Sequence, residues 1–275
     1  MKKAGLIFLL ACASAWADAP PLRVVASFYP MYVMTLNVVG DAPGVSVECL
    51  TEPATRCLHD YHFTPRNMAT LARADVLVVH GAGMEPFLQK VERPSLKIVS
   101  AKAASPHGWV SIAGAISQTR KIAQGLAGAD PARAEIYKKN SEAYAARLEF
   151  LRKKMHAILD EIPHRQIVTF HDAFADFARE FNLQVVAVIE REPGSEPNAG
   201  ELAQTIRAIR EKNVRALFAE PQYPARSARL IRRETGLPVY TLDPAATGPR
   251  EPAQARDSYL KTMEANLKTL QEALK

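Results

Sequence analysis

The stretch DVLVVHG, residues 75–81, indicates which kind of sheet this chain builds. Its residues 76–79 are all apolar, whereas a strand with one face in water alternates apolar and polar side chains. Strands that are buried on both faces are typical of parallel sheets covered by helices. The stretch therefore predicts a parallel sheet inside an α/β fold.

Similar runs recur along the chain and fall into two groups. The first group comprises residues 22–28, 45–50, 75–81 and 96–101, and the second comprises 166–171, 184–189, 216–220 and 238–243. Helical patterns lie between the runs, for example at 198–213 and after Thr64, which suits an N-cap before a proline. Strands that alternate with helices predict two lobes, each with a mostly four-stranded parallel sheet flanked by helices.

One long helix is expected between the two groups, over residues 130–163. Asp130 can cap this helix, Pro131 suits its first turn, Pro163 stops it, and no glycine interrupts it. An ordinary surface helix would have the same pattern, but a rigid strut that joins two lobes is the sharper interpretation. The expected organisation, in chain order, is signal peptide 1–17, N-terminal lobe 18–129, linking helix 130–163 and C-terminal lobe 164–275.

The N-terminus has the features of a secretory signal peptide. Two lysines precede the apolar residues 6–13, and the small-x-small site Ala15-Trp16-Ala17 follows them. Cleavage there predicts export to the periplasm, and lipidation at Cys12 is the alternative. Nothing beyond this segment is apolar for long enough to span a bilayer.

The charge pattern argues against nucleic acid as a partner. The full chain carries a formal net charge of +6, and loss of residues 1–17 removes two of its 35 Lys and Arg and none of its 29 acids, leaving +4. No run of basic residues of the kind that binds phosphates is present.

Two cysteines, Cys49 and Cys57, remain after cleavage. In an exported protein an even pair favours a disulfide. Two unpaired thiols, or Cys57 as a metal ligand, are the alternatives.

Side chains that bind metals follow several of the expected strands. His59 and His107 come after the second and fourth strands of the first lobe, and His171 and Asp243 end the first and last strands of the second. Ligands of open α/β sheets bind at the carboxyl ends of the strands. Two lobes with these edges facing would gather three imidazoles and a carboxylate, a closed set that suits tetrahedral zinc.

The other polar candidates are assigned lesser roles. His62 is expected at the cleft rim and His80 among residues that orient ligands, while His156 and His164 are structural or solvated. Further supporting or structural candidates are Asp60, Glu190 and Glu220. The segment EREPGSEPNAG, residues 190–200, reads as a solvated loop, with a mobile lid or permease contact as the alternative.

Five stretches resemble one family over nearly the whole chain. They are VVASFYPMY (24–32), HDYHFTPRNMATLARADVLVVHGAGMEPFL (59–88), TFHDAFADFA (169–178), FAEPQYP (218–224) and YTLDP (240–244). Together they resemble the zinc- and manganese-binding proteins of ABC importers, cluster A-I. The resemblance implies two α/β lobes on a rigid helix, metal ligands at His59, His107, His171 and Asp243, and delivery of the metal to a permease with its cytoplasmic ATPase by a monomer.

The resemblance also bears on the metal and on the alternatives. Family members that take manganese commonly have a glutamate where this chain has His171, so zinc is expected and manganese is the alternative. Departures from the family pattern are Cys57 before the first ligand, Gly108 after the second and a short spacing between those ligands. A zinc enzyme would need an open coordination position, and neither HExxH nor GxSxG is present. A surface adhesin or lipoprotein that binds metal secondarily is the remaining alternative.

Overall fold

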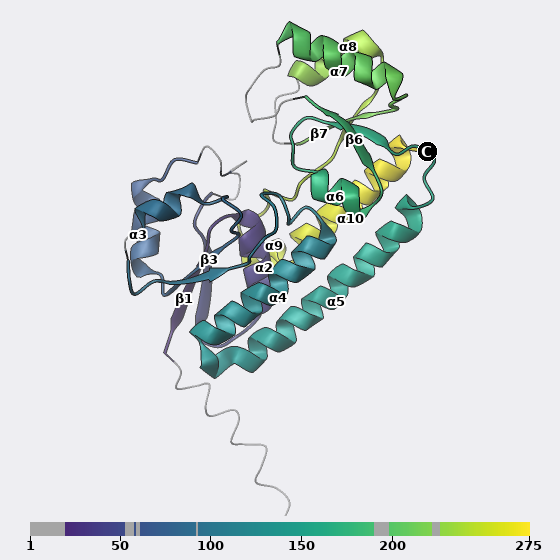
Figure 1. Ribbon diagram of the computed structural model, residues 1–275. Helices are drawn as coiled ribbons and strands as arrows, with labels where there is room; N and C mark the ends of the chain where they lie inside the picture. Colours follow the sequence, from purple (N-terminus) through teal and green to yellow (C-terminus); the bar gives the residue numbers. More distant parts are fainter. Residues whose placement is uncertain (1–19, 53–57, 59–60, 92, 190–197, 222–225) are drawn as a thin grey trace, which may run out of the picture.

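The computed structural model describes residues 20–52, 58, 61–91, 93–189, 198–221 and 226–275 (Figure 1). These residues form two four-stranded sheets in which every strand pair is parallel. The first sheet has the order β2-β1-β3-β4, with β1 at Leu22–Ala26, β2 at Val45–Cys49, β3 at Val76–Val79 and β4 at Lys97–Ser100. The second has the equivalent order β6-β5-β7-β8, with β5 at Gln166–Thr169, β6 at Gln184–Val188, β7 at Leu217–Ala219 and β8 at Val239–Thr241.

Central strands of the two sheets are covered on both faces, whereas the edge strands β2, β4, β6 and β8 are partly exposed. All four residues of β3 are buried, and so are the last three of β5. Helices contact the first sheet, with α2 (Tyr29–Val39) on β1 and β2 and α4 (Ile112–Ala129) on β4. The predicted α/β fold with two parallel four-stranded sheets is confirmed.

Further helical segments lie between the strands, and α3 and α7 among them begin where the sequence predicted helices. They are α3 (Pro65–Arg73), η1 (Pro86–Lys90), α6 (Ala175–Glu180), α7 (Ala199–Glu211) and α8 (Arg226–Thr235). The hydroxyl of Thr64 accepts a hydrogen bond from the backbone N–H of Asn67 at 3.3 Å, so the predicted N-cap of α3 is confirmed. Asn198 caps α7 in the same way.

The long linking helix is present but shorter than predicted. The α-helix α5 comprises the 26 residues Ala134–Leu159, about 39 Å at the rise of an α-helix. The preceding residues Pro131–Arg133 form the 3₁₀ turn η2 instead of a first α-turn. Asp130 makes no side-chain cap, because its Oδ2 accepts hydrogen bonds from Arg133 at 2.9 Å and Tyr137 at 2.6 Å.

The C-terminal segment returns to the first half of the chain. The short helix α9 (Pro252–Ala255) and the final helix α10 (Ser258–Ala273) both contact α2. Asn37 Nδ2 donates to the carbonyl of Arg256 at 2.9 Å, and Tyr29 Oη donates to Ser258 Oγ at 3.0 Å. One large core of buried side chains therefore includes residues from both sheets and from α10. The lobe boundaries at 129/130 and 163/164 stay a prediction.

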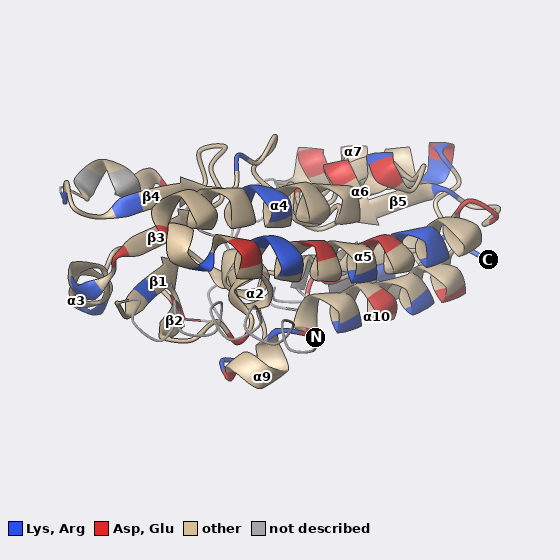
Figure 2. Cartoon of the chain, turned by 90° about the horizontal axis from the view of Figure 1, so that it is seen from below, with Lys and Arg blue, Asp and Glu red and all other residues tan. Residues whose placement is uncertain are grey.

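The outer faces of α5 and α10 carry mixed charge. Figure 2 shows Lys and Arg interspersed with Asp and Glu along both helices. Ion pairs join α5 to the C-terminal segment, with Arg147 Nη2 at 2.6 Å from Asp257 Oδ1 and Lys154 Nζ at 3.6 Å from Glu264 Oε1. Within the described ranges, no helix combines the length and apolarity that crossing a bilayer requires.

Candidate metal centre

His107 and His171 meet between the two sheets. His107 lies in the loop after β4, and His171 lies two residues beyond the end of β5. Their ring centroids are 4.9 Å apart and the rings are nearly perpendicular, at 88°. The imidazole of His171 is buried, with a residue exposure of 5%. The structure thus brings two of the predicted ligands together, one from each half of the chain.

Glu220 lies beside His171. It follows β7 directly, and its Oε1 is 3.3 Å from Nδ1 of His171. Both side chains are removed from water, at 1% and 6% exposure. A buried carboxylate against one nitrogen of an imidazole fixes the orientation of the ring and directs the other nitrogen elsewhere. Glu220 was expected only as a weak supporting candidate, yet it contacts His171 directly.

Asp243 lies at the carboxyl end of β8, where its position is fixed by Asn266 of α10. The backbone N–H of Asp243 donates to Asn266 Oδ1 at 2.9 Å, and Asn266 Nδ2 donates back to the Asp243 carbonyl at 2.7 Å. Oδ1 of Asp243 accepts from the backbone N–H of Ala245 at 2.8 Å. Burial raises the pKa of the Asp243 carboxyl, against the lowering effect of the Ala245 hydrogen bond. A nearby cation would favour the charged form of such a group.

Trp109 connects the loop that carries His107 to the segment that carries Asp243. Its Nε1–H donates to the carbonyl of Pro244 at 2.8 Å, and its ring centroid is 5.4 Å from that of His107. Tyr259 of α10 donates its hydroxyl to the Trp109 carbonyl at 2.8 Å. Sequence reasoning did not single out Trp109, although the large aromatic two residues after His107 was a usable signal.

His80 also contacts the loop that carries His107. It is fully buried at the end of β3, with Nε2 donating to the carbonyl of Ser105 at 3.0 Å and Nδ1 3.1 Å from Gln118 Oε1. Burial lowers the pKa of the His80 imidazole. Glu85 accepts hydrogen bonds from the backbone N–H groups of His80 and Gly81 at 2.7 and 3.0 Å, which fixes this turn.

The first predicted ligand, His59, lies outside the described residues, as do Cys57, Asp60 and Glu190. Among the residues that are described, no three His, Cys, Asp or Glu side chains form a group that could hold a metal ion by themselves. His62 is exposed. His107 and His171 therefore lie together. Asp243 lies at the same edge of the second sheet as His171, but it does not form one compact group with the two histidines.

Cys49 carries a free thiol in the structure, and Cys57, its expected disulfide partner, lies outside the described residues. Its Sγ is 3.9 Å from Thr51 Oγ1, and burial raises the pKa of the thiol to about 12. A thiol with such a pKa stays protonated at neutral pH and is a poor nucleophile.

Two parallel-sheet units on a long helix, with histidines meeting between them, define a two-lobed binding protein. The chain belongs to the family described as "Zinc-uptake complex component A periplasmic", whose model matches residues 24–273. This match confirms the resemblance seen in the sequence motifs.

Relatives and solved structures agree with this assignment. The zinc-binding lipoprotein AdcA of Streptococcus pneumoniae is 26% identical over 297 residues, which cover 97% of this chain but only 58% of AdcA. The structure of the laminin-binding protein Lmb of Streptococcus agalactiae superposes with a TM-score of 0.83 at 27% identity, over 92% of this chain and 100% of Lmb. The binding protein FpvC of Pseudomonas aeruginosa, solved with Mn²⁺, gives a TM-score of 0.82 at 31% identity, over 92% of this chain and 98% of FpvC.

Proposed function

We propose that this chain binds one zinc ion between its two lobes and delivers it to the membrane permease of an ABC importer. The proposed ligands are His59, His107, His171 and Asp243. The observation that carries the proposal is the meeting of His107 and His171, from different sheets, at a ring-centroid separation of 4.9 Å.

This separation suits a shared metal ion. With Zn–N bonds of about 2.0–2.1 Å and tetrahedral angles, two imidazoles on one zinc have centroids about 5 Å apart. Glu220 against Nδ1 of His171 leaves Nε2 of that ring as the nitrogen for the metal. Imidazole nitrogen is a preferred ligand of zinc, and a carboxylate from Asp243 would complete a mixed set.

Zinc is favoured over manganese by the donor types. Manganese prefers oxygen ligands, whereas the proposed set contains three imidazoles. AdcA is named as zinc-binding, while FpvC was solved with Mn²⁺, so membership of the family alone does not decide the metal. Manganese is therefore the alternative that a competition experiment must distinguish.

We place the protein in the periplasm as a monomer, after cleavage of a signal peptide at residues 1–17. Lipidation at Cys12 is the alternative form of attachment, and both segments lie outside the described residues. Lmb is described as a bifunctional protein with adhesin and metal-transporting activity. For this chain transport is the proposed role, and no catalytic role is assigned.

Native mass spectrometry of protein purified without added metal tests the proposal directly. One zinc per chain is expected, lost on chelation and regained on addition of zinc chloride. No bound zinc, or two equivalent zinc ions, would contradict a single site between the lobes.

Competition calorimetry with zinc and manganese tests the choice of metal. The change His171→Glu replaces an imidazole by a carboxylate, so it should weaken zinc binding and narrow the difference from manganese. His164→Glu makes the same chemical change outside the site and serves as the control. An unchanged zinc-to-manganese ratio in His171→Glu would show that His171 does not set selectivity.

A further inference from the structure

The short helix α6 follows His171 in the chain and carries two carboxylates one turn apart, Asp176 and Glu180. Both reach across to the other half of the chain, where they contact the two ends of the His107 loop, defined as residues 105–111. Ser105 lies two residues before His107, and Ser111 lies four residues after it.

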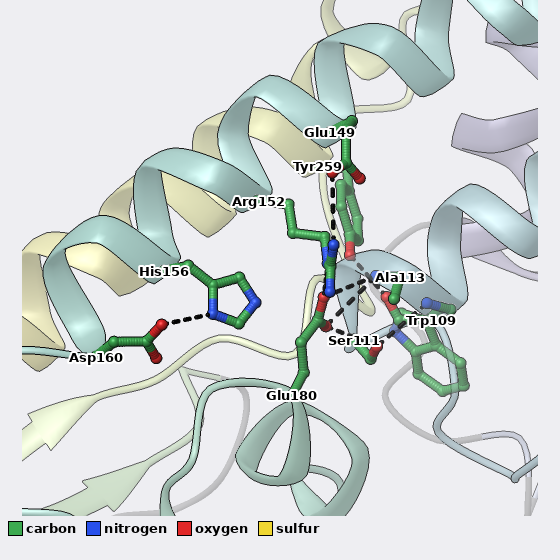
Figure 3. A network of polar contacts seen from close by, with 10 residues as sticks. Trp109, Ser111, Ala113, Glu149, Arg152, His156, Asp160, Glu180 and Tyr259 are labelled. Atoms are coloured by element: carbon green, nitrogen blue, oxygen red, sulfur yellow. Dashed lines mark hydrogen bonds and ion pairs between the residues drawn. The ribbon is translucent and has the colours of Figure 1, made fainter.

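Glu180 holds the far end of the loop at the start of α4. Ser111 Oγ donates to Glu180 Oε2 at 2.7 Å, and the backbone N–H of Ala113 donates to Oε1 at 3.1 Å. Arg152 of α5 donates its Nε–H to the same Oε1 at 2.6 Å. Figure 3 shows the carboxylate of Glu180 between these groups, with Trp109 adjacent to Ser111.

Asp176 holds the near end of the loop. Ser105 Oγ donates to Asp176 Oδ2, and the carbonyl of the same Ser105 accepts from His80. Ser105 is therefore fixed by its side chain to one half of the chain and by its backbone to the other.

These contacts are energetically significant because they are largely buried and charged. The Glu180 side chain is 5% exposed and that of Arg152 is 33% exposed. A carboxylate at this depth needs charged or hydrogen-bonding partners, and its negative charge is favourable at the N-terminus of a helix such as α4. Loss of one partner would leave the other polar groups without their full set of hydrogen bonds and allow the loop to move.

We propose that Asp176 and Glu180 are positioning residues, which fix both ends of the His107 loop and hold His107 opposite His171 before any metal binds. The proposal rests on the proposed function, since it assumes that these histidines bind the ion. Preorganisation of this kind raises affinity because less order has to be imposed on binding.

Zinc titration of the full chain and its variants tests the proposal. Glu180→Gln keeps the shape of the side chain and removes its charge, and it should weaken zinc binding about tenfold. Asp176→Asn, at a more exposed position, should weaken it about threefold. Glu149→Gln is the matched control: Glu149 contacts the same Arg152 at 3.4 Å but does not touch the loop, so zinc affinity should stay within about twofold.

Trp109 fluorescence separates positioning from a general loss of stability. The tryptophans of the chain are Trp16 and Trp109, and Trp16 lies in the segment proposed to be cleaved, so Trp109 is the sole tryptophan of the mature protein. In the metal-free state, Glu180→Gln should shift Trp109 emission to longer wavelength, because the loop is released. At saturating zinc the spectrum should return to that of the parent protein.

Each outcome decides between the interpretations. Wild-type zinc affinity and emission in both Glu180→Gln and Asp176→Asn would overturn the proposal, and so would an equal loss of affinity in Glu149→Gln. If Glu180→Gln does not fold, Asp176→Asn decides alone. If the unsubstituted protein binds no zinc, the proposed function fails, while the emission of the metal-free variants still tests whether α6 fixes the loop.

Discussion

His171 combines burial, a carboxylate partner and a facing imidazole, which sets it apart from the exposed His62. If His171 binds zinc, His171→Ala should remove most of the stabilisation that zinc gives. At free zinc about 100 times the dissociation constant, that stabilisation is about 2.7 kcal/mol. Thermal unfolding with and without zinc chloride measures the difference.

His62→Ala is the matched control for this measurement. It also deletes one imidazole, but from a side chain on the surface, so the zinc-induced rise in melting temperature should persist. Equal zinc-induced shifts of melting temperature in His171→Ala and His62→Ala would mean that the assignment of His171 as a ligand and His62 as a rim residue is wrong.

His80 gives the metal-free protein a defined dependence on pH. Burial lowers its pKa in the folded state below the ordinary value of about 6.5, so below that pH the unfolded chain binds the extra proton. The contribution of His80 to the free energy of unfolding is therefore complete above about pH 6.5 and declines as the pH falls. The decline cannot exceed about 1.4 kcal/mol per pH unit.

Urea denaturation at pH 7.5, 6.5 and 5.5 checks this prediction. His80→Gln should be less stable at pH 7.5 because its contacts to Ser105 and Gln118 are altered. Its stability should also fall less than that of the wild type between pH 6.5 and 5.5. Parallel pH profiles would mean that His80 does not cause the decline.

Residue positions after strands could be predicted from sequence, but their tertiary partners could not. His107, His171 and Asp243 follow their strands as expected, because the end of an apolar run is a local signal. Trp109 bonds to Pro244 and Asn266 to Asp243 only after distant segments pack together, and nothing local to either residue encodes these contacts.

At the scale of elements, substitution by alanine at two glycines of α4 should have opposite effects on the free energy of unfolding. A Cβ at Gly125 would lie 2.4 Å from Val99 Cγ1 of β4, whereas a Cβ at Gly128 would meet no atom within 4 Å. Gly125→Ala should therefore lower the free energy of unfolding by about 1–3 kcal/mol through overpacking. Gly128→Ala should raise it by about 0.5–1 kcal/mol, because glycine costs more backbone entropy in a helix.

Guanidinium denaturation of the two variants measures both effects under the same conditions. If Gly125→Ala is as stable as Gly128→Ala, α4 does not pack on β4 as closely as described. The pair is well matched, since both changes add one methyl group to the same helix.

The central strands and the alternation of elements could be predicted because a strand that is buried on both faces is a continuous apolar run. The predicted start of α5 is too early, because Asp130 looks like a cap but accepts hydrogen bonds from Arg133 and Tyr137. The return of α9 and α10 to α2 was not predicted, since an amphipathic helix does not specify which surface it covers.

At the scale of the whole molecule, the shared core predicts one unfolding transition. Side chains from both sheets, α5 and α10 belong to one large buried cluster, which couples the two halves, while a smaller cluster lies within the second half. Scanning calorimetry of the metal-free protein should give a single peak, with equal calorimetric and van't Hoff enthalpies. Two separable peaks, or a difference between the Trp109 and circular-dichroism midpoints, would contradict this prediction.

The placement of α10 also determines when the fold can be completed. Ribosomes make α2 early and α10 last, yet Tyr29 and Asn37 of α2 take their partners from residues 256–258. A chain that enters a secretion channel N-terminus first would therefore leave the part of α2 that contacts α9 and α10 uncovered until residues 252–273 had crossed. This order would favour the unfolded state during passage and delay closure of the core until the chain is released.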